Sequence, residues 1–233
     1  MHFRIKLVFA AALALAFLPA RPASAAPQDD LKSVLDRLNV AAQNFHSTSA
    51  DVEFDDITTD PIYDKDVFKG VVYYDRKGTA FRMGVHFSQH NRKPSTKAYT
   101  FVGGVLKVHE SGTDQVTTYA QAGKFESYVL LGFGASGTDL AAKWEVKQTG
   151  WETIAGVKTA VLELVAKDPE IRKNLSKVTI WVDPDRAVSL KQVFTLSPTS
   201  SKICLYSNFK LNGSLPADAF NFQPETQAGK SSK

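Results

Sequence analysis

The sequence contains only one cysteine, Cys204, among its 233 residues. A single cysteine cannot form a disulfide within the chain, so the fold depends on its apolar core for stability. Cys204 lies within the apolar run of residues 203–206, and this setting predicts a buried, unreactive thiol. No group of cysteines and histidines has the spacing of a zinc site.

The sequence motifs of the common enzyme classes are also missing. There is no G-x-S-x-G elbow, no P-loop, and no G-x-G-x-x-G that opens a helix after a strand. His86 and His90 are four residues apart on a predicted strand and the loop after it, whereas that spacing aligns two metal ligands only on a helix. An enzyme would need His86, His90 or His109 to converge with carboxylates in a pocket. We therefore predict no catalytic residues, no metal site, no cofactor and no enzymatic activity.

A concentration of charge of one sign is missing as well. Residues 26–233 hold 25 basic and 24 acidic residues, because three of the basic residues lie before them. This balance argues against a nucleic-acid partner, which needs a basic stripe. The acidic residues of segment 51–56 alternate with apolar ones and lack the glycine and final glutamate of a calcium loop. We interpret them as the solvated face of a strand.

The longest apolar run is too short to cross a membrane. Residues 7–18 are apolar, follow Arg4 and Lys6, and precede the small residues 23–25. This arrangement predicts a secretory signal peptide over residues 1–25, with an uncleaved membrane anchor as the alternative. We expect one domain over residues 26–225 and a disordered basic tail over residues 226–233.

The first predicted element is an amphipathic helix over residues 29–45. Asp29 or Asp30 can cap its N-terminus. Apolar residues then recur at steps of three and four, which places them on one face of a helix. These residues are Leu31, Val34, Leu35, Leu38, Ala42 and Phe45.

After residue 49 the apolar period changes from that of a helix to the two-residue period of strands. Short alternating segments recur down to residue 211, separated by turn residues such as Gly103 and Gly104. We count about eleven: 49–55, 67–74, 79–87, 97–102, 105–110, 115–120, 144–149, 159–166, 177–182, 188–196 and 202–211. Turns are predicted at residues 75–78 and 168–174. Many short strands at this spacing predict a mainly β fold, an open antiparallel barrel or a strongly curved sheet.

Residues 124–133 interrupt the alternation. They are apolar without a two-residue period and are bounded by glycines, so we predict a short apolar helix that covers other apolar surface. A second helical turn is predicted at residues 138–143.

The strands carry more aromatic and aliphatic side chains than one thin core requires. The segment 67–83 has aromatic residues on both faces, and Arg76 falls at its predicted turn. A curved sheet of this size can enclose an apolar cavity for a ligand. Alternatively, the first helix fills the sheet and nothing binds.

The sequence resembles the LolA/LolB-like family of periplasmic carriers of outer-membrane lipoproteins. The likeness extends over most of the chain after residue 25, from the first helix and the long strand after it to the closing F-x-F-x-P pattern of residues 220–224. It includes the run Gly70, Tyr73, Tyr74 and Arg76, then Phe81 and Arg82, and the late strand pair 162–167 and 178–182.

This resemblance implies an open antiparallel barrel with short lid helices over an apolar cavity that takes up the acyl chains of a lipoprotein. It implies a periplasmic monomer that receives its cargo from an inner-membrane transporter and passes it to an outer-membrane receptor. A protein of this fold that carries another lipid, or senses lipoproteins for a signalling pathway, would show the same pattern. Lys77 stands where the family usually has proline, which leaves the cargo and the partner surfaces open.

The resemblance also implies a set of site residues. Arg76 corresponds by position to an arginine at the cavity mouth that holds the helical lid closed through hydrogen bonds. The lid would consist of the first helix and residues 124–133. The residues implied to line the cavity or form the lid are Arg76, Tyr74, Phe81, Phe68, Leu35, Leu38, Tyr128 and Leu131.

Overall fold

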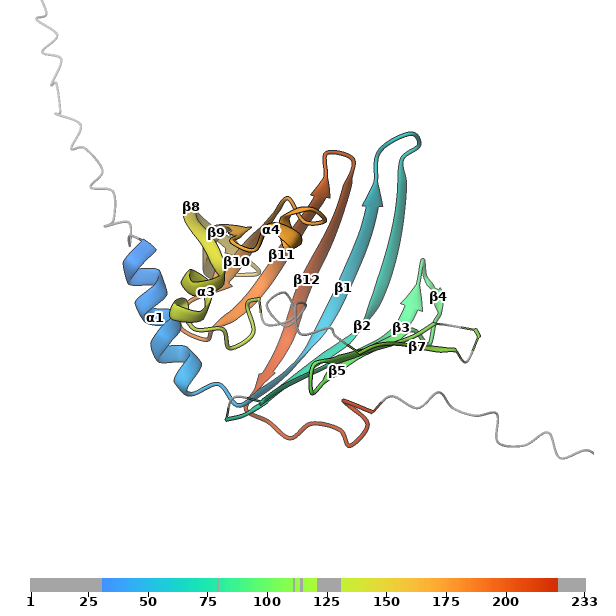
Figure 1. Cartoon of the computed structure of the whole chain (residues 1–233). Helices are drawn as coiled ribbons and strands as arrows, with labels where there is room; N and C mark the ends of the chain where they lie inside the picture. Colours follow the sequence, from blue (N-terminus) through green and yellow to red (C-terminus); the bar gives the residue numbers. More distant parts are fainter. Residues whose placement is uncertain (1–30, 79, 111, 114, 121–130, 222–233) are drawn as a thin grey trace, which may run out of the picture.

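The computed structural model describes residues 31–221, except residues 79, 111, 114 and 121–130 (Figure 1). The predicted signal peptide, the basic tail and Tyr128 lie outside the described residues, so those expectations remain predictions. The helices are α1 (Leu31–Gln43), α3 (Gly137–Lys143) and α4 (Pro169–Arg172). No helix among the described residues combines the length and the apolar character needed to cross a membrane.

The strands form one curved antiparallel sheet in which β7 and β8 are the two edges. Their order is β7-β6-β5-β3-β2-β1-β12-β11-β10-β9-β8, with β4 paired to β3. Their bounds are β1 (Ser47–Thr58), β2 (Asp64–Lys77), β3 (Ala80–His90), β4 (Lys93–Pro94), β5 (Ala98–Val102), β6 (Val105–His109), β7 (Val116–Tyr119), β8 (Trp144–Ile154), β9 (Val157–Ala166), β10 (Lys177–Asp183), β11 (Val188–Ser197) and β12 (Ser200–Leu211). The prediction of an open antiparallel sheet with short helices is confirmed.

Several strands are longer than the alternation predicted. The predicted turn at residues 75–78 is wrong in extent, because Asp75 and Arg76 pair with Arg82 and Phe81 inside the ladder of β2 and β3. Charged residues continue a hairpin that projects into water, and hydrophobic alternation cannot detect such an extension. β8 likewise continues past Gly150 through a register shift.

Two predictions about helices need correction. Residues 168–174 were predicted as a turn but contain α4. This helix begins at Pro169, and the Asp168 side chain caps its N-terminus. The predicted helix over 124–133 is wrong for its last three residues, since Leu131 and Gly132 form a turn and Phe133 forms a β-bridge with Val188. The rest of that segment lies outside the described residues.

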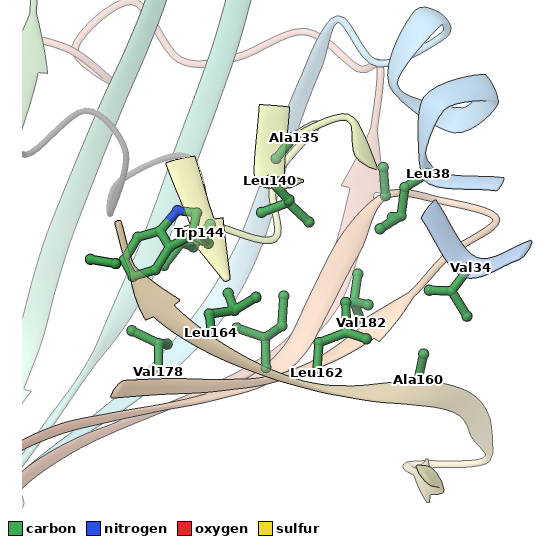
Figure 2. Packing of buried hydrophobic residues seen from close by; sticks show 14 of the residues in the cluster. Val34, Leu38, Ala135, Leu140, Trp144, Ala160, Leu162, Leu164, Val178 and Val182 are labelled. Atoms are coloured by element: carbon green, nitrogen blue, oxygen red, sulfur yellow. The ribbon is translucent and has the colours of Figure 1, made fainter. Parts of the chain in front are cut away.

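The first of two apolar cores joins the helices to one half of the sheet. Val34 and Leu38 on α1 and Leu140 on α3 are almost fully buried against β8, β9 and β10. Figure 2 shows these side chains pointing toward Leu162 and Leu164 of β9. The apolar stripe of α1 therefore packs as predicted, although the helix ends at Gln43 instead of residue 45.

The second core lies on the other half of the sheet and contains no residue of the described helices. It is built from the inward-facing side chains of β1, β2, β3, β5, β11 and β12, together with Phe45 and Phe133. Because side chains alternate between the faces of a strand, every second residue of β2, such as Val72 and Tyr74, faces this core. The helices thus cover one half of the concave face, whereas side chains of the strands, with Phe45 and Phe133, fill the core of the other half.

Candidate functional site

A short segment, residues 131–135, crosses the concave face between the two cores; we call it the strap. Its backbone pairs with the start of β11: the Ser189 N–H donates to the Gly132 carbonyl at 2.6 Å, and the Gly134 N–H donates to the Ala187 carbonyl at 2.8 Å. Leu131 belongs to the first core and Phe133 to the second. The strap therefore separates the concave face into two compartments.

Two glycines give the strap its shape. Gly132 and Gly134 adopt φ values of +73° and +68°, which side-chain-bearing residues rarely adopt. A Cβ at Gly132 would also collide with the Ser189 side chain, and one at Gly134 with the Phe45 ring. The G-F-G sequence thus turns the backbone twice and directs the aromatic ring between the glycines into the second core.

Phe133 is the centre of the buried end of the second core. Its side chain is fully buried and stacks on Tyr74, with ring centroids 3.9 Å apart. It also meets Tyr206 edge-on at 4.8 Å. Aromatic pairs with this geometry contribute about 0.5–1.5 kcal/mol beyond their burial, so the ring forms a firm wall across the concave face.

A buried hydrogen-bonded pair supports that wall. The Gln192 amide donates to the Leu131 carbonyl of the strap, and its oxygen accepts from the Tyr206 hydroxyl at 3.1 Å. Burial raises the pKa of Tyr74 and of Tyr206, so both hydroxyls stay neutral and act as hydrogen-bonding groups. Burial also raises the pKa of the Cys204 thiol to about 12, and the predicted inert cysteine is confirmed as buried.

The opposite end of the second core is an aromatic cluster that remains partly open; we call it the rim cluster. It consists of Phe54, Phe68, Phe87 and Tyr99, from β1, β2, β3 and β5. The Phe68 ring lies 5.4 Å from Phe87 and 6.1 Å from Phe54, and Tyr99 meets Phe87 edge-on at 6.0 Å. Phe87 is buried, whereas the other three rings are half-buried. Apolar ring surface at this end therefore contacts solvent.

Two lysines border the rim cluster. The Lys97 ammonium lies 5.4 Å from the centre of the Phe68 ring, and the Lys202 ammonium lies 5.6 Å from that of Phe54. Lys97 also forms an ion pair with Glu110 at 3.1 Å, and Lys202 with Asp56. Burial lowers the pKa of Lys97, but the negative groups beside it outweigh that effect, and its pKa is raised overall. Lys97 therefore stays charged at neutral pH. The two lysines mark a polar boundary to an apolar surface.

The structure divides the site residues predicted from the sequence between the two cores. Leu35, Leu38 and Leu131 pack in the first core, whereas Phe68, Tyr74 and Phe81 lie in the second. Phe68 stands at the rim cluster, and Tyr74 and Phe81 stand at the wall. The predicted residues therefore fall in two separate cores, and Leu131 is itself part of the strap between these cores.

Arg76 lies where β2 approaches the loop after α1. Its backbone N–H donates to the His46 carbonyl at 2.8 Å, and its register partner on β3 is Phe81. Within the described part of the chain, its guanidinium has no hydrogen bond or ion pair. The lid-holding role of Arg76 stays a prediction.

The histidines do not gather into one site. His86 lies against the Tyr73 ring, His90 stacks on Phe68 and bonds Asp66 at 2.7 Å, and the His109 Nδ1 lies 3.0 Å from the Thr96 carbonyl oxygen. Among the residues that the structure describes, no group of three or more His, Cys, Asp or Glu side chains could hold a metal ion.

Two surface hollows lie away from the rim cluster. One follows the outward side of α1 and includes Arg37, Val40 and Asp185. The other lies on the convex face of the sheet around Gly70 and Leu205. Their linings are mixed polar and apolar, whereas the rim cluster is aromatic.

Sequence reasoning missed Phe133, Gln192 and the two lysines as site residues. The glycines beside Phe133 were the available signal, because G-F-G inside an apolar run favours a sharp turn over a helix. The Gln192 bond to the strap spans 61 residues and had no local signal.

No protein-family model matches this sequence, and no curated protein matches it significantly. Among solved structures, the chain is similar to a DUF1329 family protein from Desulfovibrio piger, with 14% identity, coverage of 82% of this chain and 97% of that one, and a TM-score of 0.45. A LolA superfamily protein from Nitrosomonas europaea has 16% identity, coverage of 83% and 98%, and a TM-score of 0.41.

The MucA/MucB complex of Pseudomonas aeruginosa is also similar, with 13% identity and a TM-score of 0.49. This match covers 84% of the present chain but only 62% of the other. A LolA superfamily protein thus occurs among the similar structures. Identities of 13–16% with TM-scores below 0.5 carry no argument about ligand or partner.

Proposed function

We propose that this protein is an exported carrier that binds acyl chains of a lipoprotein or lipid on its concave face. The observation that carries the proposal is the rim cluster, in which three half-buried aromatic rings surround the buried Phe87 on the concave face. The core on this half of the sheet contains no residue of a described helix. Apolar surface of this kind on a soluble protein favours an apolar ligand.

The binding energy would come from burial of methylene groups. Each methylene removed from water contributes about 0.8 kcal/mol, so a chain lying along the rim cluster gains enough to bind without any covalent step. The lysines beside the rings keep their charges at the edge, where a polar headgroup would stay in water. Nothing in this mechanism requires a catalytic group, and we propose that the protein is not an enzyme.

The route of transfer is part of the proposal. With a cleaved signal peptide over residues 1–25, the carrier would act in the periplasm, take its cargo from an inner-membrane transporter and deliver it to an outer-membrane receptor. This proposal rests on the pattern of the first 25 residues and on the family resemblance of the sequence.

Native mass spectrometry of the protein purified from its own cell envelope tests the proposal. We expect a bound lipoprotein or acylated lipid that is released when the protein unfolds. A protein without bound lipid, which also fails to take up acyl chains from detergent-free mixed vesicles, would contradict a carrier function. The Phe68→Ser variant should co-purify with less lipid than the wild type, because the substitution removes a central ring of the rim cluster.

Arg76 offers a test of the predicted lid. We expect Arg76→Leu to load cargo normally but to transfer it more slowly to acceptor membranes. Arg82→Leu is the matched control, since Arg82 is the next arginine along the chain and already pairs with Asp75. Equal transfer by wild type and Arg76→Leu would remove Arg76 from the mechanism.

A further inference from the structure

The turn between β1 and β2 carries the most exposed apolar residues of the described chain. Ile62 is 76% exposed and Tyr63 is 64% exposed, and both follow Pro61 at the end of the hairpin. Large apolar side chains standing together at a tip usually mark a contact surface. We call residues 59–65 the hairpin tip.

The hairpin tip projects beyond β3. β3 ends at His90, opposite Phe68 of β2, and Asn91 after it still exchanges hydrogen bonds with Val67. His90 and Asn91 also bond the Asp66 carboxylate, so β2 continues past these contacts for two residues, Lys65 and Asp64. At about 3.3 Å per residue, this extension is roughly 7 Å long. Figure 1 shows the turn between β1 and β2 at the top of the view, above the ends of β3 and β4.

The tip is held in place on its other side. The Thr59 N–H donates to the Thr199 carbonyl at 2.8 Å, which ties the tip to the turn between β11 and β12. Lys65, at the end of the tip, also forms an ion pair with Asp55 of β1 at 2.8 Å. The apolar pair is therefore presented on an ordered support.

The charge around the apolar pair is negative. Asp60 and Asp64 flank Ile62 and Tyr63 on both sides, and within the described residues neither carboxylate forms an ion pair. Lys65, the basic residue of the tip, is already paired with Asp55.

We infer that the hairpin tip docks into a partner protein that has an apolar pocket bordered by lysine or arginine residues. Isoleucine and tyrosine fill such a pocket, and the two free carboxylates match its basic border. An anionic lipid surface fits less well, because both carboxylates would be repelled where the apolar pair inserts. The inference concerns a partner and does not depend on what the concave face binds.

Site-specific photo-crosslinking tests this inference. The full-length chain with benzoylphenylalanine at Ile62 is produced in its own cells and irradiated, with the same amino acid at Ala155, in the turn between β8 and β9, as the control position. We expect one heterologous protein adduct from position 62 and none from 155. The combined substitutions Asp60→Lys and Asp64→Lys should lower its yield at least tenfold, and the crosslinked partner peptide should contain lysine or arginine.

Three outcomes would overturn the inference: no adduct from position 62, an adduct unaffected by the charge reversal, or an adduct with a second copy of this chain. A lipid surface is tested separately by sedimentation of the purified protein with vesicles of phosphatidylethanolamine and phosphatidylglycerol. Binding that Ile62→Ser abolishes would assign the tip to a membrane instead. The charge-reversed variant should keep wild-type circular dichroism and lipid content, which separates this result from a failure of the proposed carrier function.

Discussion

At the scale of single residues, burial decides which groups react. Cys204 faces the second core, where the raised pKa keeps its thiol protonated. We expect no reaction of the native protein with a thiol reagent such as Ellman's reagent at pH 8, and reaction of one thiol per chain after unfolding in guanidinium. Rapid labelling of the native protein would mean that the core around Cys204 opens readily.

One exposed ion pair links α1 to the turn after β10. The Arg37 guanidinium bonds both carboxylate oxygens of Asp185, at 2.9 and 2.7 Å, and this hydrogen bonding holds the pKa of Asp185 below its ordinary value of 3.8. A lowered folded-state pKa stabilises the fold above the ordinary value, and that contribution is lost as the pH falls through the folded value. Asp185 is 69% exposed, so solvent screening limits the pair to less than about 1 kcal/mol.

The corresponding prediction concerns Asp185→Asn. Urea unfolding at pH 7 should show a small loss of stability relative to wild type, and the difference should shrink as the pH falls through the lowered pKa of Asp185. A difference that does not change with pH would assign the effect to packing. Asp36→Asn is the control, because Asp36 pairs with Lys32 on the same helix.

The residues also differ in how far the sequence could predict them. The stripe from Val34 to Ala42 was predictable, because a helix repeats its buried face at a fixed spacing and the first core uses that face. The inward faces of β2 and β9 were predictable for the same reason at a period of two. The roles of Gln192 and Lys202 were not, since each depends on contacts with residues far away in the sequence.

At the scale of elements, the strap is the feature that the sequence concealed. An apolar run without alternation predicts a helix, and residues 131–133 instead form a turn and a β-bridge. Two features decide this conformation: the positive φ values of the two glycines of the strap, and the packing of the Phe133 ring against Tyr74 and Tyr206. Both are three-dimensional properties that no local periodicity reports.

Removing the Phe133 ring should therefore loosen the strap first. We expect Phe133→Ala to lower the free energy of unfolding by about 3–5 kcal/mol, and Phe133→Leu by less, because leucine refills part of the space. Hydrogen exchange should accelerate most at the Gly134 and Ser189 amides, which bind across the strap. Exchange that accelerates equally at the Leu162 amide in β9 would mean that the two cores unfold as one unit.

At the scale of the whole molecule, one curved sheet serves two purposes. Its β8–β10 half is covered by α1 and α3 and supplies stability (Figure 2). Its β1–β5 half presents the rim cluster, with a buried aromatic wall at one end and half-buried rings at the other. The open order of strands, with edges at β7 and β8, lets the two halves differ without breaking the hydrogen-bonded ladder.

The most direct test of the carrier account is a titration of delipidated protein with palmitoyl lysophosphatidylcholine by isothermal calorimetry. The account predicts saturable binding, weakened about ten- to hundredfold by Phe68→Ala, because one aromatic contact of roughly 1.5–3 kcal/mol is lost. Tyr73→Ala is the matched control: Tyr73 lies on the same strand but faces outward against His86, and its removal should leave the dissociation constant unchanged. No binding by the wild type, or equal weakening by both substitutions, would contradict acyl-chain binding at the rim cluster.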